Sequence, residues 1–154
     1  MALTLRKALP EDLTACTAVL EGSEILERYY AGEGVLARML AKAEAEGQLY
    51  VAGDEAGSIS GLLKLVPGGF CGLYPYIALL AVGGAYRGQG VGRFLLAQAE
   101  AMGTADGARK LALLVSDFNA AAKAMYQRCG FYEVGLIPEA ARPGIGEYLM
   151  LKDL

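Results

Sequence analysis

The stretch that decides the fold is residues 81–96, AVGGAYRGQGVGRFLL. An apolar run ends at Val82, glycines crowd the turn that follows, and a helical pattern begins near Val91. Backbone N–H groups at such a turn can converge on an anion, and the first turn of a helix adds partial positive charge. Glycine lets a phosphate approach the backbone without a side chain in between. The stretch therefore predicts a site for a phosphate-bearing ligand.

Two common phosphate motifs do not fit this turn. A P-loop needs a Gly-Lys-Ser/Thr ending, which the turn lacks, and the dinucleotide pattern Gly-x-Gly-x-x-Gly would need glycine where the chain has Arg93. The turn instead contains the pattern Arg87-x-x-Gly90-x-Gly92. This pattern resembles Gln/Arg-x-x-Gly-x-Gly/Ala, the acetyl-CoA signature of the GCN5-related N-acetyltransferase (GNAT) family.

A second motif lies downstream, at residues 119–131, NAAAKAMYQRCGF. It is similar to the second motif of the same family, with Asn119 at the head of a helix, Tyr126 one turn before its end, and then Gly130 and Phe131. The order and separation of the two motifs also match. The resemblance extends from about Tyr76 to Phe131.

The resemblance implies that acetyl-CoA is the acetyl donor and predicts which residues contact it. The backbone of the strand end would contact the pantetheine arm, through Leu80, Ala81 and Val82. The turn would hold the diphosphate, through Arg87, Gly88, Gln89, Gly90, Val91 and Gly92. Asn119 would contact the pantetheine amides, although a helix cap alone would also explain an asparagine there, and Asp117 competes for that role.

Tyr126 is the residue that the resemblance implies as general acid, because the departing CoA thiolate needs a proton. A phenol with a pKa of about 10 is protonated at neutral pH and can supply it. The general base stays open. Residues 76–80, YIALL, carry no carboxylate where relatives often have glutamate on this strand. A water chain, a backbone carbonyl or a glutamate from another segment could serve.

An acidic and aromatic segment between the first helices is the candidate acceptor site. In relatives this region walls the acceptor, and here Glu27 and Tyr30 are the substrate-binding candidates, with Glu24, Glu33 and Tyr29 nearby. Carboxylates and aromatic faces could bind a cationic amine. A solvated amphipathic helix explains the same residues without a ligand, and is the favoured interpretation.

Composition narrows the function classes. The 154 residues are 55% hydrophobic and carry a net charge of -3 with a pI near 5.0, which argues against nucleic acid as the main partner. The chain has no histidine, so Ser-His-Asp chemistry and the usual metal ligand are excluded, and no metal is expected. Its three widely spaced cysteines favour a reducing cytoplasm. Neither a signal peptide nor a membrane span is expected.

The length of 154 residues predicts a single domain over residues 1–154. Hydrophobic periodicity predicts its strands and helices. The predicted strands are 3–6, 49–53, 58–66, 73–82, 110–115, 132–137 and 147–151, and the predicted helices are 10–20, 24–30, 35–46, 91–102 and 119–129. Turns are expected at 67–69 and, as a Pro/Gly-rich loop, between the last two strands. The strand–helix–strand unit at 73–115 implies a parallel pair, and the hairpin at 49–66 adds antiparallel strands.

The predicted fold class is therefore α/β in the broad sense, a mixed sheet with helices on both faces. The resemblance to the GNAT fold adds splayed central parallel strands, ending near Val82 and Val115. It implies an N-acetyltransferase that acts on a primary amine of a small molecule or peptide. A non-catalytic acyl-CoA-binding or sensor module and a plain structural protein are the alternatives. An exposed final strand could pair across a homodimer.

Overall fold

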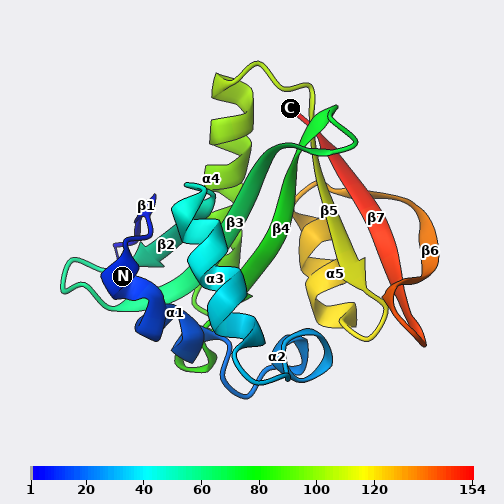
Figure 1. Cartoon of the computed structure of the whole chain (residues 1–154). Coiled ribbons are helices and arrows are strands. Elements are labelled where there is room, and N and C mark those ends of the chain that lie inside the picture. The colour runs from blue at the N-terminus through cyan, green and yellow to red at the C-terminus, as the bar shows by residue number, and fades with distance from the viewer. Residues whose placement is uncertain (1) are drawn as a thin grey trace. The chain divides into compact units, whose positions relative to one another are not determined.

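The computed structural model of the chain describes residues 2–154, which form two compact units. Unit 1 contains the chain up to Leu65 together with Leu79–Leu95, and unit 2 contains Val66–Ala78 and Leu96–Leu154. Seven strands form one mixed sheet in the order β1-β2-β3-β4-β5-β7-β6, which confirms the predicted fold class (Figure 1). No helix among the described residues is long and apolar enough to cross a bilayer.

Unit 1 begins with an antiparallel ribbon and three helices. Its elements are β1 (Thr4–Lys7), η1 (Pro10–Asp12), α1 (Leu13–Val19), α2 (Glu24–Tyr29), α3 (Val35–Ala45), β2 (Leu49–Gly53), the first part of β3 (Ile59–Phe70), the end of β4 (Tyr74–Val82), η2 (Gly84–Tyr86) and the start of α4 (Val91–Ala105). β2 pairs antiparallel with β1. It also pairs antiparallel with β3, and these two strands form the predicted hairpin. Pro10 opens η1 as the sequence predicts.

The helices of unit 1 cover both faces of its strands. Leu20, the residue after α1, and Leu40 of α3 are fully buried in one cluster with Leu62 of β3. Successive residues of a strand face opposite sides, so the preceding residue, Gly61, faces away from this cluster. A Cβ at Gly61 would lie 2.8 Å from Val91 Cγ1, so the start of α4 packs on that opposite face.

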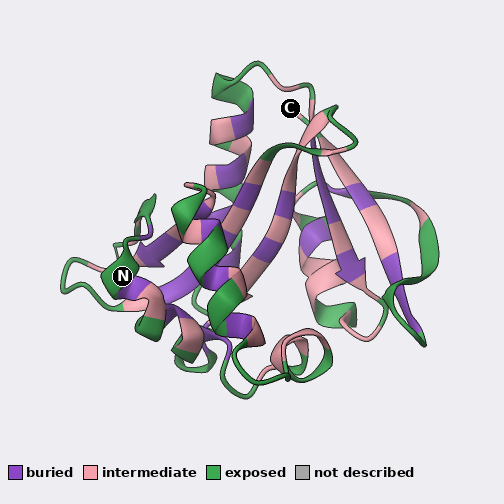
Figure 2. Cartoon of the chain, in the orientation of Figure 1, coloured by how far each residue is buried: buried purple, intermediate pink, exposed green. Residues whose placement is uncertain are grey.

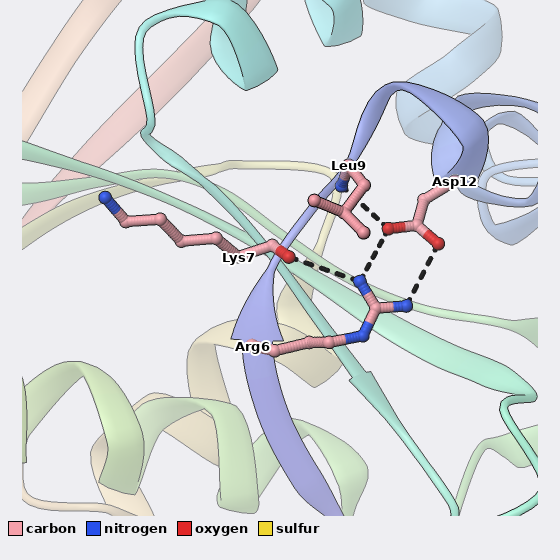
Figure 3. Close-up of polar contacts among 4 residues, drawn as sticks. All are labelled: Arg6, Lys7, Leu9 and Asp12. Carbon is pink, nitrogen blue, oxygen red and sulfur yellow. Dashed lines mark hydrogen bonds and ion pairs between the residues drawn. The ribbon is translucent and has the colours of Figure 1, made fainter.

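An ion pair between Arg6 of β1 and Asp12 of η1 links the first strand to the first helical segment (Figure 3). Arg6 Nη1 donates to Asp12 Oδ2 at 2.6 Å and Arg6 Nη2 donates to Asp12 Oδ1 at 3.0 Å. The Leu9 N–H also donates to Asp12 Oδ2, at 2.7 Å, which satisfies a backbone donor at the start of η1. The hydrogen bond from Arg6 lowers the pKa of Asp12, and the Leu9 N–H acts in the same direction.

Unit 2 is built around β5 (Lys110–Ser116) and two helices. It also holds the rest of β3, β4 and α4, together with α5 (Ala120–Arg128), β6 (Tyr132–Arg142) and β7 (Ile145–Asp153). β4 pairs parallel with β5 at Tyr76↔Ala112 and Ile77↔Leu113, which confirms the predicted parallel pair. β7 pairs antiparallel with β5 and β6. The expected divergence of β4 and β5 stays a prediction.

The predicted turn at Pro67–Gly69 is wrong, because β3 continues to Phe70. A Cβ at Gly69 would lie 2.9 Å from Tyr76 Cβ, so β3 and β4 approach closely where a turn was expected. The chain reverses instead at Cys71 and Gly72, both with positive φ, and the Leu73 N–H donates to Phe70 O at 2.8 Å. Two central residues with positive φ characterise a tight hairpin turn.

The last two strands also differ from their predicted arrangement. β6 and β7 are longer than expected and only Pro143 and Gly144 lie between them. The expectation that the final strand is exposed is wrong: β7 lies between β5 and β6, and its first three residues are buried. β6 is the edge strand and is exposed along almost its whole length (Figure 2).

Candidate functional site

The glycine turn of unit 1 keeps its backbone accessible. Residues 87–90 are exposed, and both Gly88 (φ 74°) and Gly90 (φ 84°) adopt the left-handed conformation that favours glycine. No described atom lies within 4 Å of the place where a Cβ would stand at either glycine. Both positions are therefore sterically open, and their contact with a phosphate stays a prediction.

The first N–H groups of the helix that follows the turn lack acceptors within that helix. The Phe94 N–H donates to Gly90 O at 2.9 Å, which is the i→i−4 bond of the first turn of α4. The N–H groups of Val91 and Gly92 precede it and have no acceptor four residues back within the helix. Together with the helix dipole, they can bind an anion. Gln89 Nε2 donates to Ala85 O at 3.2 Å, which braces the loop.

Gly61 of β3 positions this helix and was missed by sequence reasoning. A Cβ there would meet Val91 Cγ1 at 2.8 Å, and Ala81 O and Leu95 Cδ1 at 3.0 Å each. Its lack of a side chain lets α4 start directly against the strands. A glycine inside a strand with apolar neighbours is the signal that could have identified it, since such glycines mark close approaches.

The strand end that leads into the turn is half-buried. Leu80, Ala81 and Val82 are all partly accessible, whereas Leu79 belongs to the core of unit 1. Beyond Val82, the Gly83 N–H donates to Ser60 O at 2.8 Å and ties the turn to β3. The predicted backbone contacts of this segment with a pantetheine arm stay a prediction.

Asn119 of unit 2 caps α5. Its Oδ1 accepts a hydrogen bond from the Ala122 N–H at 3.2 Å. Asp117, the competing cap candidate, instead accepts from the Gly146 N–H at 2.9 Å through Oδ2. The cap uses the carbonyl oxygen of the Asn119 side chain and not its amide donors, so the cap and the predicted pantetheine contact are compatible.

Tyr126 is buried near the end of α5, with 8% of its surface exposed. Its ring meets that of Phe131 edge-on, and the Phe131 N–H donates to Tyr126 O at 3.0 Å. Burial raises the pKa of the phenol to about 12. The side chain is therefore protonated at neutral pH, the state that a general acid requires.

The predicted acceptor residues lie in or beside α2 of unit 1. Glu27 is exposed, whereas Tyr30 packs against the core cluster. Glu24 Oε2 pairs with Arg28 Nε at 3.3 Å one helical turn away. The charged side chains lie outward and the apolar ones inward, as in a solvated amphipathic helix. A role for Glu27 or Tyr30 in binding the acceptor stays a prediction.

Potential metal ligands are not clustered. Among residues 2–154, no three Cys, Asp or Glu side chains are arranged to hold a metal ion. Cys16 is buried, Cys71 is exposed and Cys129 is intermediate, and all three are free thiols. Burial raises the pKa of the Cys16 thiol to about 11. It is a core residue and not an activated nucleophile.

Known proteins resemble this chain in sequence and in fold. The model of the Acetyltransferase (GNAT) family matches residues 10–131. A GCN5-related N-acetyltransferase from Kribbella flavida superposes with a TM-score of 0.78 at 25% identity, over 99% of this chain and 98% of the other. No curated sequence matches significantly.

Two further solved structures share the fold at lower identity. The ribosomal-protein-S18-alanine N-acetyltransferase from Escherichia coli has a TM-score of 0.74 at 21% identity, over 99% of this chain and 94% of its own. A spermidine N-acetyltransferase chimera from Vibrio cholerae SpeG and hSSAT has a TM-score of 0.81 at 21% identity, over 98% of this chain and 95% of the chimera. At these identities, the likeness establishes the fold alone.

Proposed function

Because the chain belongs to the GNAT acetyltransferase family, we propose that it transfers the acetyl group of acetyl-CoA to a primary amine. The observation that carries this proposal is the turn before α4. Its two left-handed glycines leave open space, and the following N–H groups have no acceptor in the helix. These features suit a diphosphate, and the sequence there has the acetyl-CoA signature of the family.

Both main-chain and side-chain groups bind the donor, acetyl-CoA. The amides of Gly88 to Gly92 bind the diphosphate, and Arg87 adds positive charge. The strand end at Leu80 to Val82 offers backbone groups to the peptide-like pantetheine arm. Asn119 binds the pantetheine amides through its side-chain amide, because its Oδ1 already caps α5.

Transfer proceeds directly from donor to acceptor. The neutral amine nitrogen attacks the thioester carbonyl, the new C–N bond forms, and the C–S bond breaks. Tyr126 gives its proton to the departing thiolate and recovers one from solvent. The amine loses its own proton to a base that the strand 76–80 does not supply, since this segment carries no carboxylate. The backbone N–H near Leu80 or Ala81 stabilises the oxyanion.

The acceptor is a small-molecule or peptide amine. The neighbours in fold include enzymes named for a ribosomal-protein alanine and for spermidine, which are both amines. The three free thiols fit a reducing compartment, which supports a cytoplasmic location. The edge strand β6 exposes Val134, Leu136 and Ile137 and is the strand that would pair across a homodimer.

A thiol-release assay with an amine panel tests the proposal. The purified protein is mixed with acetyl-CoA and with polyamines, amino acids, aminoglycosides or peptides, and the products are identified by mass spectrometry. We expect one amine class to be acetylated as the thioester is consumed.

A second candidate is an acyl-CoA-binding module without catalysis, which the missing strand carboxylate at residues 76–80 favours. Tight acetyl-CoA binding without acetylation of any amine would support this candidate. A protein that neither binds nor consumes acetyl-CoA would refute both functions.

A further inference from the structure

The end of α5 is closed by a tight backbone turn that includes Tyr126. The Phe131 N–H donates to Tyr126 O at 3.0 Å, and the Gly130 N–H donates to Gln127 O at 3.1 Å. Gly130 has φ 96°, in the left-handed region. Two such hydrogen bonds around a left-handed glycine form a Schellman motif, and the ring contact between Tyr126 and Phe131 is the apolar contact that accompanies it. The placement of Tyr126 therefore depends on how the helix ends.

The carbonyl group of Cys129, the residue after α5, is bound by a lysine from the last strand. The final carbonyls of a helix have no partner within it, and they carry partial negative charge. Lys152 Nζ of β7 donates to Cys129 O at 2.6 Å. The ammonium group supplies a donor and also opposes the partial charge at this end of the helix. Lys152 thus completes the end of α5 from outside the helix.

Two further contacts fix the side chain of Lys152. A Cβ at Gly130 would lie 3.1 Å from Lys152 Cε, so the lysine stem runs directly alongside the turn. Lys152 Nζ also pairs with Glu100 Oε1 of α4 at 2.6 Å, and the two side chains are only 22% and 27% exposed. Charge-assisted hydrogen bonds to a carboxylate and to a carbonyl therefore hold the ammonium group in place.

α5 contacts β7 at two points, one on each side of Tyr126 in the sequence. At the first point, Lys123 Nζ lies 3.5 Å from the centroid of the Tyr148 ring. At the second point, Lys152 binds Cys129 O. Tyr148 and Lys152 are four residues apart and point to the same face of β7. Lys123 and Cys129 are each three residues from Tyr126. The first contact is made by a side chain of the helix and the second by its main chain.

We propose that Lys152 is a positioning residue for the transfer reaction: it holds the Cys129 carbonyl against β7 and thereby fixes the direction of the Tyr126 hydroxyl. This inference rests on the proposed function, in which Tyr126 protonates the departing thiolate. A general acid must lie within hydrogen-bond reach of the atom that it protonates, and small displacements of a reacting group are costly. Lys152 gives no proton to the substrate and acts through Tyr126.

The test combines Lys152→Met with Tyr126→Phe. Methionine keeps an unbranched stem beside Gly130 but removes the donor and the charge. We expect Lys152→Met to lower kcat about 10-fold and to leave the KM for acetyl-CoA unchanged. In the Tyr126→Phe background, the same substitution should lower kcat no further, because no hydroxyl remains to be displaced. A residue with a merely structural role would lower kcat by the same factor in both backgrounds.

Lys123→Met is the matched control. The Lys123 side chain is also 22% exposed, and it joins α5 to the last two strands through Glu133 and Tyr148. It should lose at least as much stability in urea as Lys152→Met, yet keep the kcat of the wild type. An unchanged kcat in Lys152→Met, an equal loss of kcat in Lys123→Met, or additive losses in the double variant would overturn the inference.

If Lys152→Met does not fold, Glu100→Gln replaces it, because this change removes the charged partner of the ammonium group. A smaller loss of kcat is then expected, again absent in the Tyr126→Phe background, and an unchanged kcat or an additive loss overturns the inference. Wild-type activity separates the two claims. An active wild type with an unaffected Lys152→Met overturns only the role of Lys152, whereas a wild type that acetylates no amine refutes the proposed function and this inference with it.

Discussion

The rings of Tyr126 and Phe131 meet edge-on, with centroids 5.9 Å apart and planes inclined by 61°. The contact joins the last turn of α5 to the residue just before β6, and the Phe131 N–H to Tyr126 O bond reinforces it. It fixes the ring of Tyr126 by packing, independently of its hydroxyl. The hydroxyl can therefore be removed without loss of this support, which makes its chemical role testable.

Tyr126→Phe should lower kcat about 100-fold, because the thiolate loses its proton donor. Acetyl-CoA affinity and thermal stability should stay near wild type, because the ring contact with Phe131 is retained. Steady-state kinetics and calorimetry provide the two readouts. Tyr132→Phe, which removes an exposed hydroxyl bonded to Asp153, is the control. An unchanged kcat in Tyr126→Phe would exclude this residue from the mechanism.

Gly90→Val should weaken acetyl-CoA binding, because the added side chain would occupy the space proposed for the diphosphate. The left-handed φ also costs about 1–2 kcal/mol of stability for any residue other than glycine. Gly107→Val is the matched control: Gly107 has φ 77° and open space, and it follows the end of α4. Both variants should lose similar stability in urea, and calorimetry should show weakened binding in Gly90→Val alone. Equal affinities would contradict the assignment of the turn.

Gly61→Ala should shift the start of α4, because the new Cβ would lie 2.8 Å from Val91 Cγ1 and 3.0 Å from Ala81 O. We expect a loss of about 1–3 kcal/mol in the free energy of unfolding, together with weaker acetyl-CoA binding. Adding Val91→Ala removes one of the three close contacts, which also include Leu95 Cδ1, and should recover part of the affinity. A Gly61→Ala variant with wild-type stability would show that this contact does not position the helix.

Asp12→Asn should destabilise the protein by about 1–2 kcal/mol at neutral pH through loss of the ion pair with Arg6, whereas the remaining amide oxygen can still accept from the Leu9 N–H. Because folding lowers the pKa of Asp12, its stabilising contribution is present above about pH 4 and is lost as the pH falls through the folded-state pKa. The difference from wild type in urea unfolding should therefore shrink at acid pH. Glu11→Gln, an exposed neighbour, should show no such trend. A difference that does not vary with pH would contradict the role of this pair.

The three thiols should react at very different rates with a disulfide reagent. Cys71 is exposed and should react first, whereas Cys16 has no exposed surface and a pKa raised by burial to about 11. Cys71→Ser should remove the fast phase, and Cys16 should react only after denaturation. Rapid labelling of Cys16 in the native protein would contradict the core packing of α1.

Sequence periodicity predicted most elements because their apolar patterns are local. Val35–Ala45 and Lys110–Ser116 lie almost where their patterns place them. The predicted turn at Pro67–Gly69 is wrong because strand pairing overrides the local turn propensity and brings Gly69 against Tyr76. The place of β7 between β5 and β6 depends on pairing between distant segments, which periodicity does not encode.

The candidate site likewise contains residues that a local motif predicts and residues that no local motif predicts. The turn at 87–92 and the helix head at Asn119 have motifs that depend on a few neighbouring residues. Gly61 has none, because its importance arises from its close approach to Val91, which lies 30 positions away in the sequence.

The central claim is that main-chain amides at the start of α4 bind the diphosphate of acetyl-CoA. An amide NMR titration of the nitrogen-labelled protein with acetyl-CoA tests it most directly. The account predicts that the largest shifts occur at the amides of Gly88 to Gly92, with a smaller set at Asn119 and its neighbours. Saturable binding that leaves the amides of Gly88 to Gly92 unshifted would contradict it.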